Sequence, residues 1–318
     1  DGTAVVDHFV AFPGAARVSG AGSTKGSMVL HSGLQVDLRV IPSESFGAAL
    51  VYFTGSKEHN VRLRQRALAQ GLTLSEYGLF ELEDDGRPGR RRAGAEEAEV
   101  YAALGLAWVP PEIREDRGEI RAAATGRLPR LLEEGDLRGD LHMHSTWSDG
   151  RNTIEEMLAA CAGRGYEYLA LTDHSQALAM ARGLDEERLA EQWREIDEVR
   201  AAHPEIRLLA GLEVDVLADG SLDLADDMLE RLDLVVVSVH SRFELSAAEQ
   251  TRRIVRALEH PQVNVLAHPT GRLINRRKPY DFDLEEVLAC ARENRVAVEL
   301  NASPERLDLR DVHLARAR

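Results

Sequence analysis

Six short apolar runs in the second half of the chain limit the folds open to it, because helical patterns separate each run from the next. The runs are LRGDLHMH (137–144), YLALTDH (168–174), LLAGLE (208–213), LVVVSVH (234–240), VNVLAH (263–268) and VAVELN (296–301). This alternation predicts parallel strands joined by helices, in a barrel or an open sheet. We count six strand–helix units, whereas a closed barrel normally has about seven or eight.

The first five runs end in side chains that can bind a metal ion. These side chains are His142, His144, His174, Glu213, His240 and His268. The carboxyl ends of parallel strands meet at one edge, which is where such folds place their active sites. A loop after the first run returns Asp149 to the same edge. Packed core histidines could explain one such residue, but they explain poorly five histidines and two acids at five successive strand ends.

The donor types restrict the metal. Neutral imidazole and carboxylate suit Zn²⁺, Mn²⁺ or Fe²⁺, and a structural cysteine–zinc site is not indicated. Two neighbouring cations repel each other, so a bridging anion is needed, and Glu213 is the natural candidate. Asp149 and His174 could hold a further ion. Asp215 and Asp219 follow Glu213 and are expected in a polar loop.

Charge does not decide whether the partner is a nucleic acid. The 318-residue chain has a net charge of −15, which at first sight argues against binding phosphates. Residues 1–135 hold 16 Lys/Arg against 19 Asp/Glu, which leaves 23 against 35 for residues 136–318. Most of the acid excess thus lies in the half with the histidines, where bound cations would offset it.

Cysteines and hydropathy indicate the compartment. Cys161 and Cys290 fall in amphipathic helical patterns, so we expect buried free thiols, which fits a reducing cytoplasm. No apolar run is long enough to span a bilayer. We therefore expect a cytoplasmic protein without a membrane partner. We also expect a monomer.

The first half has a mixed α+β pattern. Strands are predicted at 27–30 and 34–41, helices at 45–53 and 61–70, and a solvated loop at 83–92. A polar linker is expected at 121–135. The stretch YFTGSKEHNVRLR (52–64) predicts a glycine turn opening a basic helix. Such a turn can present backbone N–H groups to an anion, but an ordinary helix start fits equally well.

The second half resembles the PHP (polymerase and histidinol phosphatase) family. The motifs are HMHS with Asp149-Gly150, Thr172-Asp173-His174, GLEVD (211–215), SVHS (238–241) and AHP (267–269). The resemblance implies a distorted (β/α)7 barrel, with six βα units present, that holds three metal ions and hydrolyses phosphoesters. It implies one ion on His142, His144 and Glu213, a second on Glu213, His240 and His268, and a third on Asp149 and His174. Glu213 and His240 would be catalytic, and Mn²⁺ is the preferred ion. The family's last motif, Asp-x-His, is expected beyond the end of this sequence.

The first half resembles the palm and thumb of family X DNA polymerases, from the 52–64 stretch, GLTLSEYGLF (71–80) and QVDLRV (35–40). The resemblance implies that Asp37 helps bind catalytic Mg²⁺ or Mn²⁺. It implies that Tyr52, Phe53, Gly55 and Ser56 contact the incoming nucleotide, and that Asn60 and Arg64 touch the minor groove. The family's paired Asp-x-Asp strand does not precede Asp37, so we expect an internal fragment of a longer polymerase.

Together the resemblances imply palm at 1–45, thumb at 46–120, linker at 121–135 and PHP domain at 136–318. The expected function is a DNA repair polymerase with a PHP 3′–5′ exonuclease, and its partners are dNTPs and DNA as primer-template, gaps or 3′ ends. Two alternatives stay open. One is a small-molecule phosphatase of the histidinol-phosphate type, and the other is a non-catalytic, metal-stabilised DNA-binding scaffold.

Overall fold

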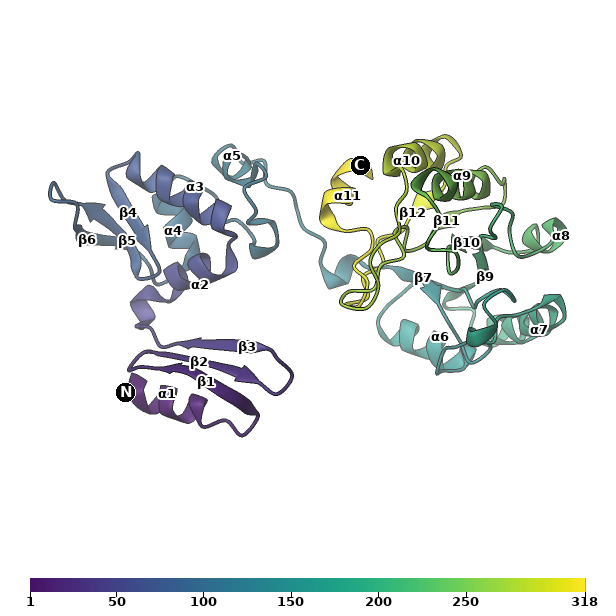
Figure 1. Cartoon of the computed structure of the whole chain (residues 1–318), viewed down its shortest axis with the longest axis horizontal. Coiled ribbons are helices and arrows are strands. Elements are labelled where there is room, and N and C mark those ends of the chain that lie inside the picture. Colours follow the sequence, from purple (N-terminus) through teal and green to yellow (C-terminus); the bar gives the residue numbers. More distant parts are fainter. Residues whose placement is uncertain (318) are drawn as a thin grey trace. The chain divides into compact units, whose positions relative to one another are not determined.

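A computed structural model describes residues 1–317 and divides the chain into two compact units, Asp1–Leu131 and the residues from Leu132 onward (Figure 1). Each unit has its own hydrophobic core. None of the helices in the described part is both long and apolar enough to cross a membrane.

The first unit begins with a three-stranded antiparallel sheet of β1 (Ala15–Ala21), β2 (Lys25–Leu30) and β3 (Gln35–Arg39). The predicted strand pair is confirmed as β2 and β3. Helix α1 (Gly2–Val10) packs against the sheet through Val6, which is fully buried. Neither α1 nor β1 was predicted from the sequence.

The rest of the first unit packs helices on a second small sheet. The helices are α2 (Phe46–Thr54), α3 (Lys57–Leu68), α4 (Glu97–Ala103) and α5 (Glu119–Ala124), and the strands are β4 (Leu72–Ser75), β5 (Gly78–Leu82) and β6 (Pro88–Ala93). Leu63, Leu79 and Val100 are fully buried in the shared core. The helices predicted at 45–53 and 61–70 are confirmed as α2 and α3, although α3 begins four residues earlier.

Two predictions about polar segments were wrong in part. The stretch 83–92, expected as a loop, includes most of strand β6. Its arginines are typical of an exposed loop, and for this reason the sequence did not indicate a strand. In the structure Arg90 and Arg92, two residues apart on β6, both form ion pairs with Glu81 of β5, at 2.8 and 3.1 Å. The expected linker 121–135 begins inside α5, where Ala123 is buried in the core. Residues 127–133 have no regular structure.

The second unit is a six-stranded parallel sheet in the order β12-β11-β10-β9-β8-β7. The strands are β7 (Gly139–Met143), β8 (Tyr168–Leu171), β9 (Arg207–Asp215), β10 (Leu234–Ser238), β11 (Val265–Leu266) and β12 (Ala297–Val298). This confirms the predicted fold class of an α+β portion followed by six βα units.

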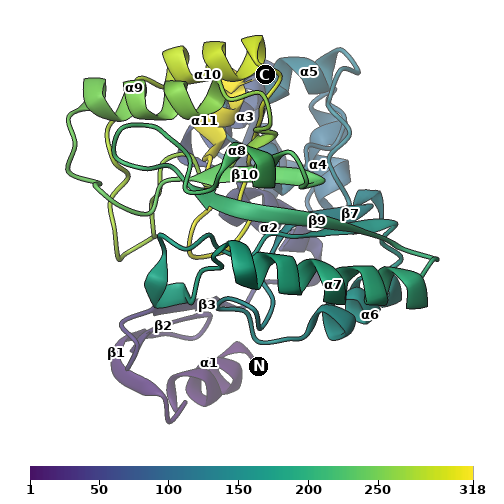
Figure 2. The same ribbon diagram turned by 90° about the vertical axis from the view of Figure 1, so that its right-hand side faces the viewer.

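Helices connect the strands of the second unit, and one helix follows the last strand. The connecting helices are α6 (Ile154–Gly163), α7 (Glu186–Ala202), α8 (Asp226–Leu229), α9 (Ala247–Leu258) and α10 (Leu284–Glu293), and the last helix is α11 (Asp311–Ala317). Helices α6 and α7 pack on each other, as do α9 and α10 (Figure 2). Capping boxes at Thr153 and Ser246 begin α6 and α9, because each hydroxyl accepts from the backbone N–H of a glutamate three residues on. Cys161 and Cys290 are buried free thiols, as expected.

Candidate functional site

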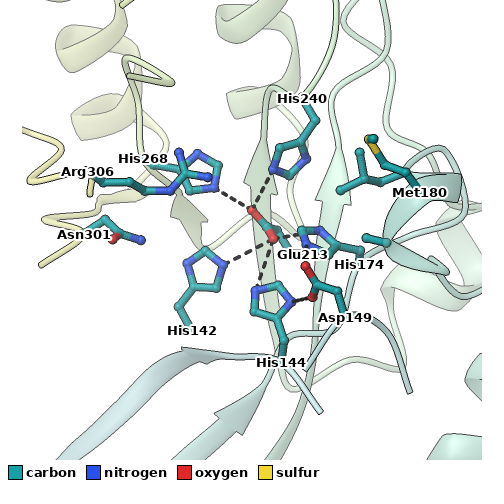
Figure 3. A pocket seen from close by; sticks show the side chains of 12 residues that line it. His142, His144, Asp149, His174, Met180, Glu213, His240, His268, Asn301 and Arg306 are labelled. Atoms are coloured by element: carbon teal, nitrogen blue, oxygen red, sulfur yellow. Dashed lines mark hydrogen bonds and ion pairs between the residues drawn. The ribbon is translucent and has the colours of Figure 1, made fainter. Parts of the chain in front are cut away.

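The carboxylate of Glu213 lies at the centre of a ring of five imidazoles (Figure 3). Glu213 lies on the central strand β9 and is 1% exposed. Its Oε1 lies 2.8 Å from His268 Nε2 and 3.5 Å from His240 Nε2. Its Oε2 faces the other three rings, at 2.9 Å from His174 Nδ1, 3.3 Å from His142 Nε2 and 3.5 Å from His144 Nε2. The two oxygens therefore face different sets of histidines.

Asp149 closes one side of this ring. Its Oδ1 lies 3.5 Å from His144 Nδ1, and its Oδ2 lies 3.7 Å from His174 Nε2. The side chain is half exposed, unlike the buried Glu213. The structure thus brings together all seven side chains predicted at the strand ends, within one cavity of about 420 Å³.

The donor set fits divalent cations. In three groups, the ligand atoms lie within 4.8 Å of one another: His142, His144 and Glu213; His144, Asp149 and His174; His174, Glu213 and His240. The buried Nδ1 atom of His144, which faces Asp149 Oδ1 at 3.5 Å, has no hydrogen-bond partner in the described part of the chain. An unpaired buried ring nitrogen is costly, and a cation would satisfy it.

The electrostatics of the ring are strongly coupled. Burial would raise the pKa of Glu213, but the surrounding histidines, led by His142, hold it well below its ordinary value. Burial lowers the pKa of His144 to about 4, although Glu213 opposes this. Burial also acts to lower the pKa of His142, but Glu213 and Glu299 outweigh it and raise that pKa to about 10. The rings cannot all be protonated together, and the neutral imidazole is the metal-binding form.

Two further carboxylates support the histidines from behind. Glu299 Oε1 lies 2.7 Å from His142 Nδ1, and its Oε2 accepts the backbone N–H of His268 at 2.5 Å. Asp215 Oδ1 lies 3.3 Å from His240 Nδ1. Such contacts orient an imidazole and select its tautomer.

These two carboxylates were not predicted. Asp215 was expected in a polar loop, but it is the last residue of β9, pairs with Ser238 of β10 and is 4% exposed. Glu299 lies in the sixth apolar run, two residues before Asn301, and that position was the available signal. Asn301 itself lines the cavity.

A buried aspartate holds the loop that carries Asp149. Asp173 accepts hydrogen bonds from Ser145 N and Oγ at 2.8 and 2.7 Å, from Gln192 Nε2 at 2.6 Å and from Ser148. A Cβ on Gly150 would lie 2.1 Å from the carbonyl oxygen of His144, so the loop returns this closely only with glycine. The loop conformation therefore brings Asp149 back towards His144.

Asp37 belongs to the first unit, where it is on β3. Its carboxylate accepts hydrogen bonds from the Ser27 hydroxyl and from Gln35 Nε2, and these bonds lower its pKa. It lines a cavity of about 590 Å³ together with Lys25, Arg39 and Phe53. The structure therefore brings Asp37 and Phe53 to one cavity.

The other residues predicted to bind nucleotide or DNA gather at the junction of α2 and α3. Ser56 caps α3, because its Oγ accepts the backbone N–H of His59 at 3.1 Å. Asn60 Nδ2 donates to the carbonyl oxygens of Tyr52 and Gly55 at 2.8 and 3.2 Å. Tyr52, Asn60 and Arg64 line one small crevice. The tight turn at Gly55 is thus fixed by the helix that follows it.

A parallel sheet with imidazoles and a buried carboxylate at its carboxyl edge defines a metal-binding α/β domain of the β/α-barrel class. Residues 140–303 match the family model of the PHP domain. The chain belongs to the PHP domain family, and this membership implies metal dependence. Residues 49–115 match the family model of the DNA polymerase beta thumb.

Two relatives match the chain over different lengths. The chain is 43% identical over 315 residues to the DNA polymerase/3'-5' exonuclease PolX of Bacillus subtilis. This match covers 98% of this chain and 54% of that protein. It is 31% identical over 166 residues to a probable phosphatase of Acetivibrio thermocellus. This match covers 51% of this chain and 64% of that protein. The chain thus spans about half the length of its Bacillus relative.

Proposed function

We propose that this chain is part of a DNA repair enzyme that joins a family X polymerase to a PHP 3′–5′ exonuclease. The observation that carries the proposal is Glu213, one buried carboxylate ringed by five imidazoles at the carboxyl edge of the sheet. The thumb match and the likeness to a polymerase/exonuclease support DNA as the substrate. We assign the palm to residues 1–45, the thumb to 46–120 and the PHP domain to 136–318.

The divided contacts of Glu213 support a bridging role. His142, His144 and Glu213 would hold one cation, Glu213, His240 and His268 a second, and Asp149 and His174 a third. Cations held there would polarise a phosphoryl oxygen and lower the pKa of a water molecule. Mn²⁺ is our preferred ion, and Zn²⁺ or Fe²⁺ would suit the same donors.

Glu299 and Asp215 orient two of the metal-binding imidazoles. With the Nδ1 proton of His142 donated to Glu299, Nε2 would be the nitrogen that binds a cation shared with Glu213. Asp215 faces Nδ1 of His240 in the same way. These contacts hold the rings in the tautomer that binds a metal.

On the polymerase side, Asp37 would be one ligand of catalytic Mg²⁺ or Mn²⁺. Tyr52, Phe53, Gly55 and Ser56 would contact the incoming dNTP, and Asn60 and Arg64 the minor groove. The shared cavity of Asp37 and Phe53 supports this assignment.

The test separates the two activities. In the full-length protein, His142→Ala or Glu213→Ala is expected to lower 3′–5′ degradation of a 5′-labelled primer by at least about 100-fold, since each removes a ligand. Nucleotide addition to the same primer is expected to stay within twofold. His203→Ala, at the end of α7, is the control. Loss of both activities, or of neither, would contradict the proposal.

A small-molecule phosphatase is the second candidate, because relatives named probable phosphatases align with the PHP half. Faster hydrolysis of histidinol phosphate than of a DNA 3′ end would favour it. A protein that binds DNA but holds no transition metal on elemental analysis would instead be a scaffold.

A further inference from the structure

We propose that the metal-site cavity has a phosphate end and a nucleoside end, with Arg306 binding the reacting phosphodiester and Met180 packing on the 3′-terminal base. The inference rests on the proposed function and adds an orientation of the substrate. Arg306 and Met180 both line the cavity, and they lie on opposite sides of Glu213 (Figure 3).

Arg306 is an unpaired cation directed into the cavity. It lies beside His268 and Asn301 (Figure 3). Its Nη1 is buried, and it has no hydrogen-bond partner among residues 1–317. The adjacent acid does not neutralise it, because Glu305 pairs with Arg276 at 3.2 Å. A guanidinium in this state recognises phosphate oxygens well, since its donors form a rigid planar fork.

The loop that carries Arg306 is fixed before any ligand binds. The Arg306 carbonyl oxygen accepts from Arg272 Nε at 2.7 Å. Asn301 and Asp308 exchange two backbone hydrogen bonds, at 2.5 and 3.1 Å, which close the loop. The Asp308 carboxylate accepts the backbone N–H of Thr270 at 3.0 Å, next to the strand end that carries His268. A preset cation binds its ligand with little loss of conformational entropy.

Overall charge supports an anionic ligand for Arg306. The half of the chain that contains it has 35 acidic against 23 basic side chains, so acidic partners for an arginine are plentiful. Arg306 nevertheless forms no ion pair in the described part of the chain. Arg306 is thus an unpaired arginine in an acidic domain, beside a cavity that fits cations. A phosphate group could contact the arginine and the cations at the same time.

Met180 provides an apolar surface at the other end. It lies on a short 3₁₀ turn (Ala179–Ala181), and its side chain is 91% exposed. Leu178, two residues earlier, also lines the cavity. The turn is held by Arg182 Nη2, which donates to the carbonyl oxygen of Thr146 at 3.2 Å. A thioether contacts an aromatic base favourably but cannot read its edge, so this end accepts any base.

The experiment measures the degradation of two single-stranded oligonucleotides by the full-length protein loaded with Mn²⁺. One ends 3′ in thymidine, and the other ends in an abasic tetrahydrofuran residue. Arg306→Ala is expected to raise KM about 10- to 100-fold on both, since a charged hydrogen bond to phosphate is lost, and Arg306→Lys to recover part of the loss. Met180→Ala is expected to slow only the thymidine end, by about 2- to 10-fold.

Control variants separate these effects from charge, stability and metal loss. Lys278→Ala removes an exposed cation outside the cavity, and Leu132→Ala removes an apolar side chain that is 74% exposed. Both are expected to match the unsubstituted protein. The Mn²⁺ content and Tm of Arg306→Ala are expected to stay unchanged.

Several results would overturn the inference. One is a KM of Arg306→Ala within twofold of that of the unsubstituted protein, and another is a loss of Mn²⁺ from Arg306→Ala. A third is a Met180→Ala protein that degrades both oligonucleotides more slowly by the same factor. Calorimetric binding of thymidine 5′-monophosphate gives a readout without turnover, and Arg306→Ala should weaken it about 10-fold. A protein that binds this nucleotide through Arg306 but degrades no DNA would refute the proposed function and leave the phosphate end standing.

Discussion

At the scale of single residues, His59 has an environment that its position in the sequence does not reveal. It lies in α3, is fully buried, and uses both ring nitrogens. Nδ1 donates to Glu119 Oε1 at 2.6 Å, and the hydroxyl of Tyr101 donates to Nε2 at 2.9 Å. This pattern holds the ring neutral. Glu119 also accepts the backbone N–H groups of Asp116 and Arg117, so the network joins α3, α4 and α5.

The network predicts that the first unit loses stability in acid. Burial lowers the pKa of His59 below its ordinary 6.5. Burial would raise the pKa of Glu119, but the hydrogen bonds from His59 and the backbone hold it below 4.5. Both groups bind protons more readily when unfolded. The stability is therefore present above pH 6.5, starts to fall below that value through His59, and falls again below pH 4.5 through Glu119.

Urea unfolding from pH 8 to pH 4, followed by circular dichroism, measures this dependence. His59→Gln is expected to cost about 1–3 kcal/mol at pH 8, because a buried donor or acceptor loses its partner. It should also flatten the decline just below pH 6.5. A variant with the same slope as the original protein would show that His59 does not titrate in this range.

At the scale of elements, the loop between β7 and α6 depends on one buried side chain. Asp173 accepts hydrogen bonds from Ser145, Ser148 and Gln192, and it lies next to His174. The hydrogen bonds of its carboxylate within residues 1–317 go to Ser145, Ser148 and Gln192 and not to a predicted metal ligand, yet they fix the loop that brings Asp149 to the ring.

Asp173→Asn is therefore expected to weaken metal binding without removing a ligand. An amide has only one acceptor oxygen, so at least one hydrogen bond to the loop is lost. Supporting contacts of this kind are typically worth about 10- to 100-fold in metal affinity. Calorimetric titration with Mn²⁺ measures the change. Asp233→Asn, which alters a partly exposed acid at the opposite end of β10, is the matched control and should bind as the original protein does.

The contrast between what was and was not predictable has a physical basis. The ring residues were predictable because strand periodicity and strand ends are local patterns, and parallel strands must share an edge. Glu299, Asp215 and Arg306 were missed because their roles depend on partners far away in sequence. His142 and Glu299, for example, are 157 residues apart. Strand β6 was missed because its arginines look solvated until Glu81 is placed beside them.

At the scale of the whole molecule, the chain has two separate cores, and residues 127–133 between them have no regular structure. The imidazole ring lies wholly in the second unit. Whatever binds the ring should therefore stabilise one core and leave the other unchanged.

Metal removal is expected to shift one of two unfolding transitions. Scanning calorimetry with saturating Mn²⁺ and then with EDTA should lower the Tm of the second unit by roughly 5–10 °C, if the ion is present at about 100 times its Kd. The first unit holds one proposed metal ligand, Asp37, and its transition should shift far less; His59→Gln identifies that transition by lowering it. An equal shift of both transitions by EDTA would mean that the units unfold together.

The two-sided carboxylate of Glu213 has a genetic consequence. Its Oε1 faces His240 and His268 while its Oε2 faces the other three rings, so two of the three proposed cation sites depend on this one side chain. Substitutions in a set that acts as one unit are strongly non-additive. Once Glu213 is replaced, adding His142→Ala or His240→Ala should cost almost nothing more. No substitution at the five histidines should then restore activity to a Glu213 variant. Position 213 should therefore be hard to change during the evolution of this domain.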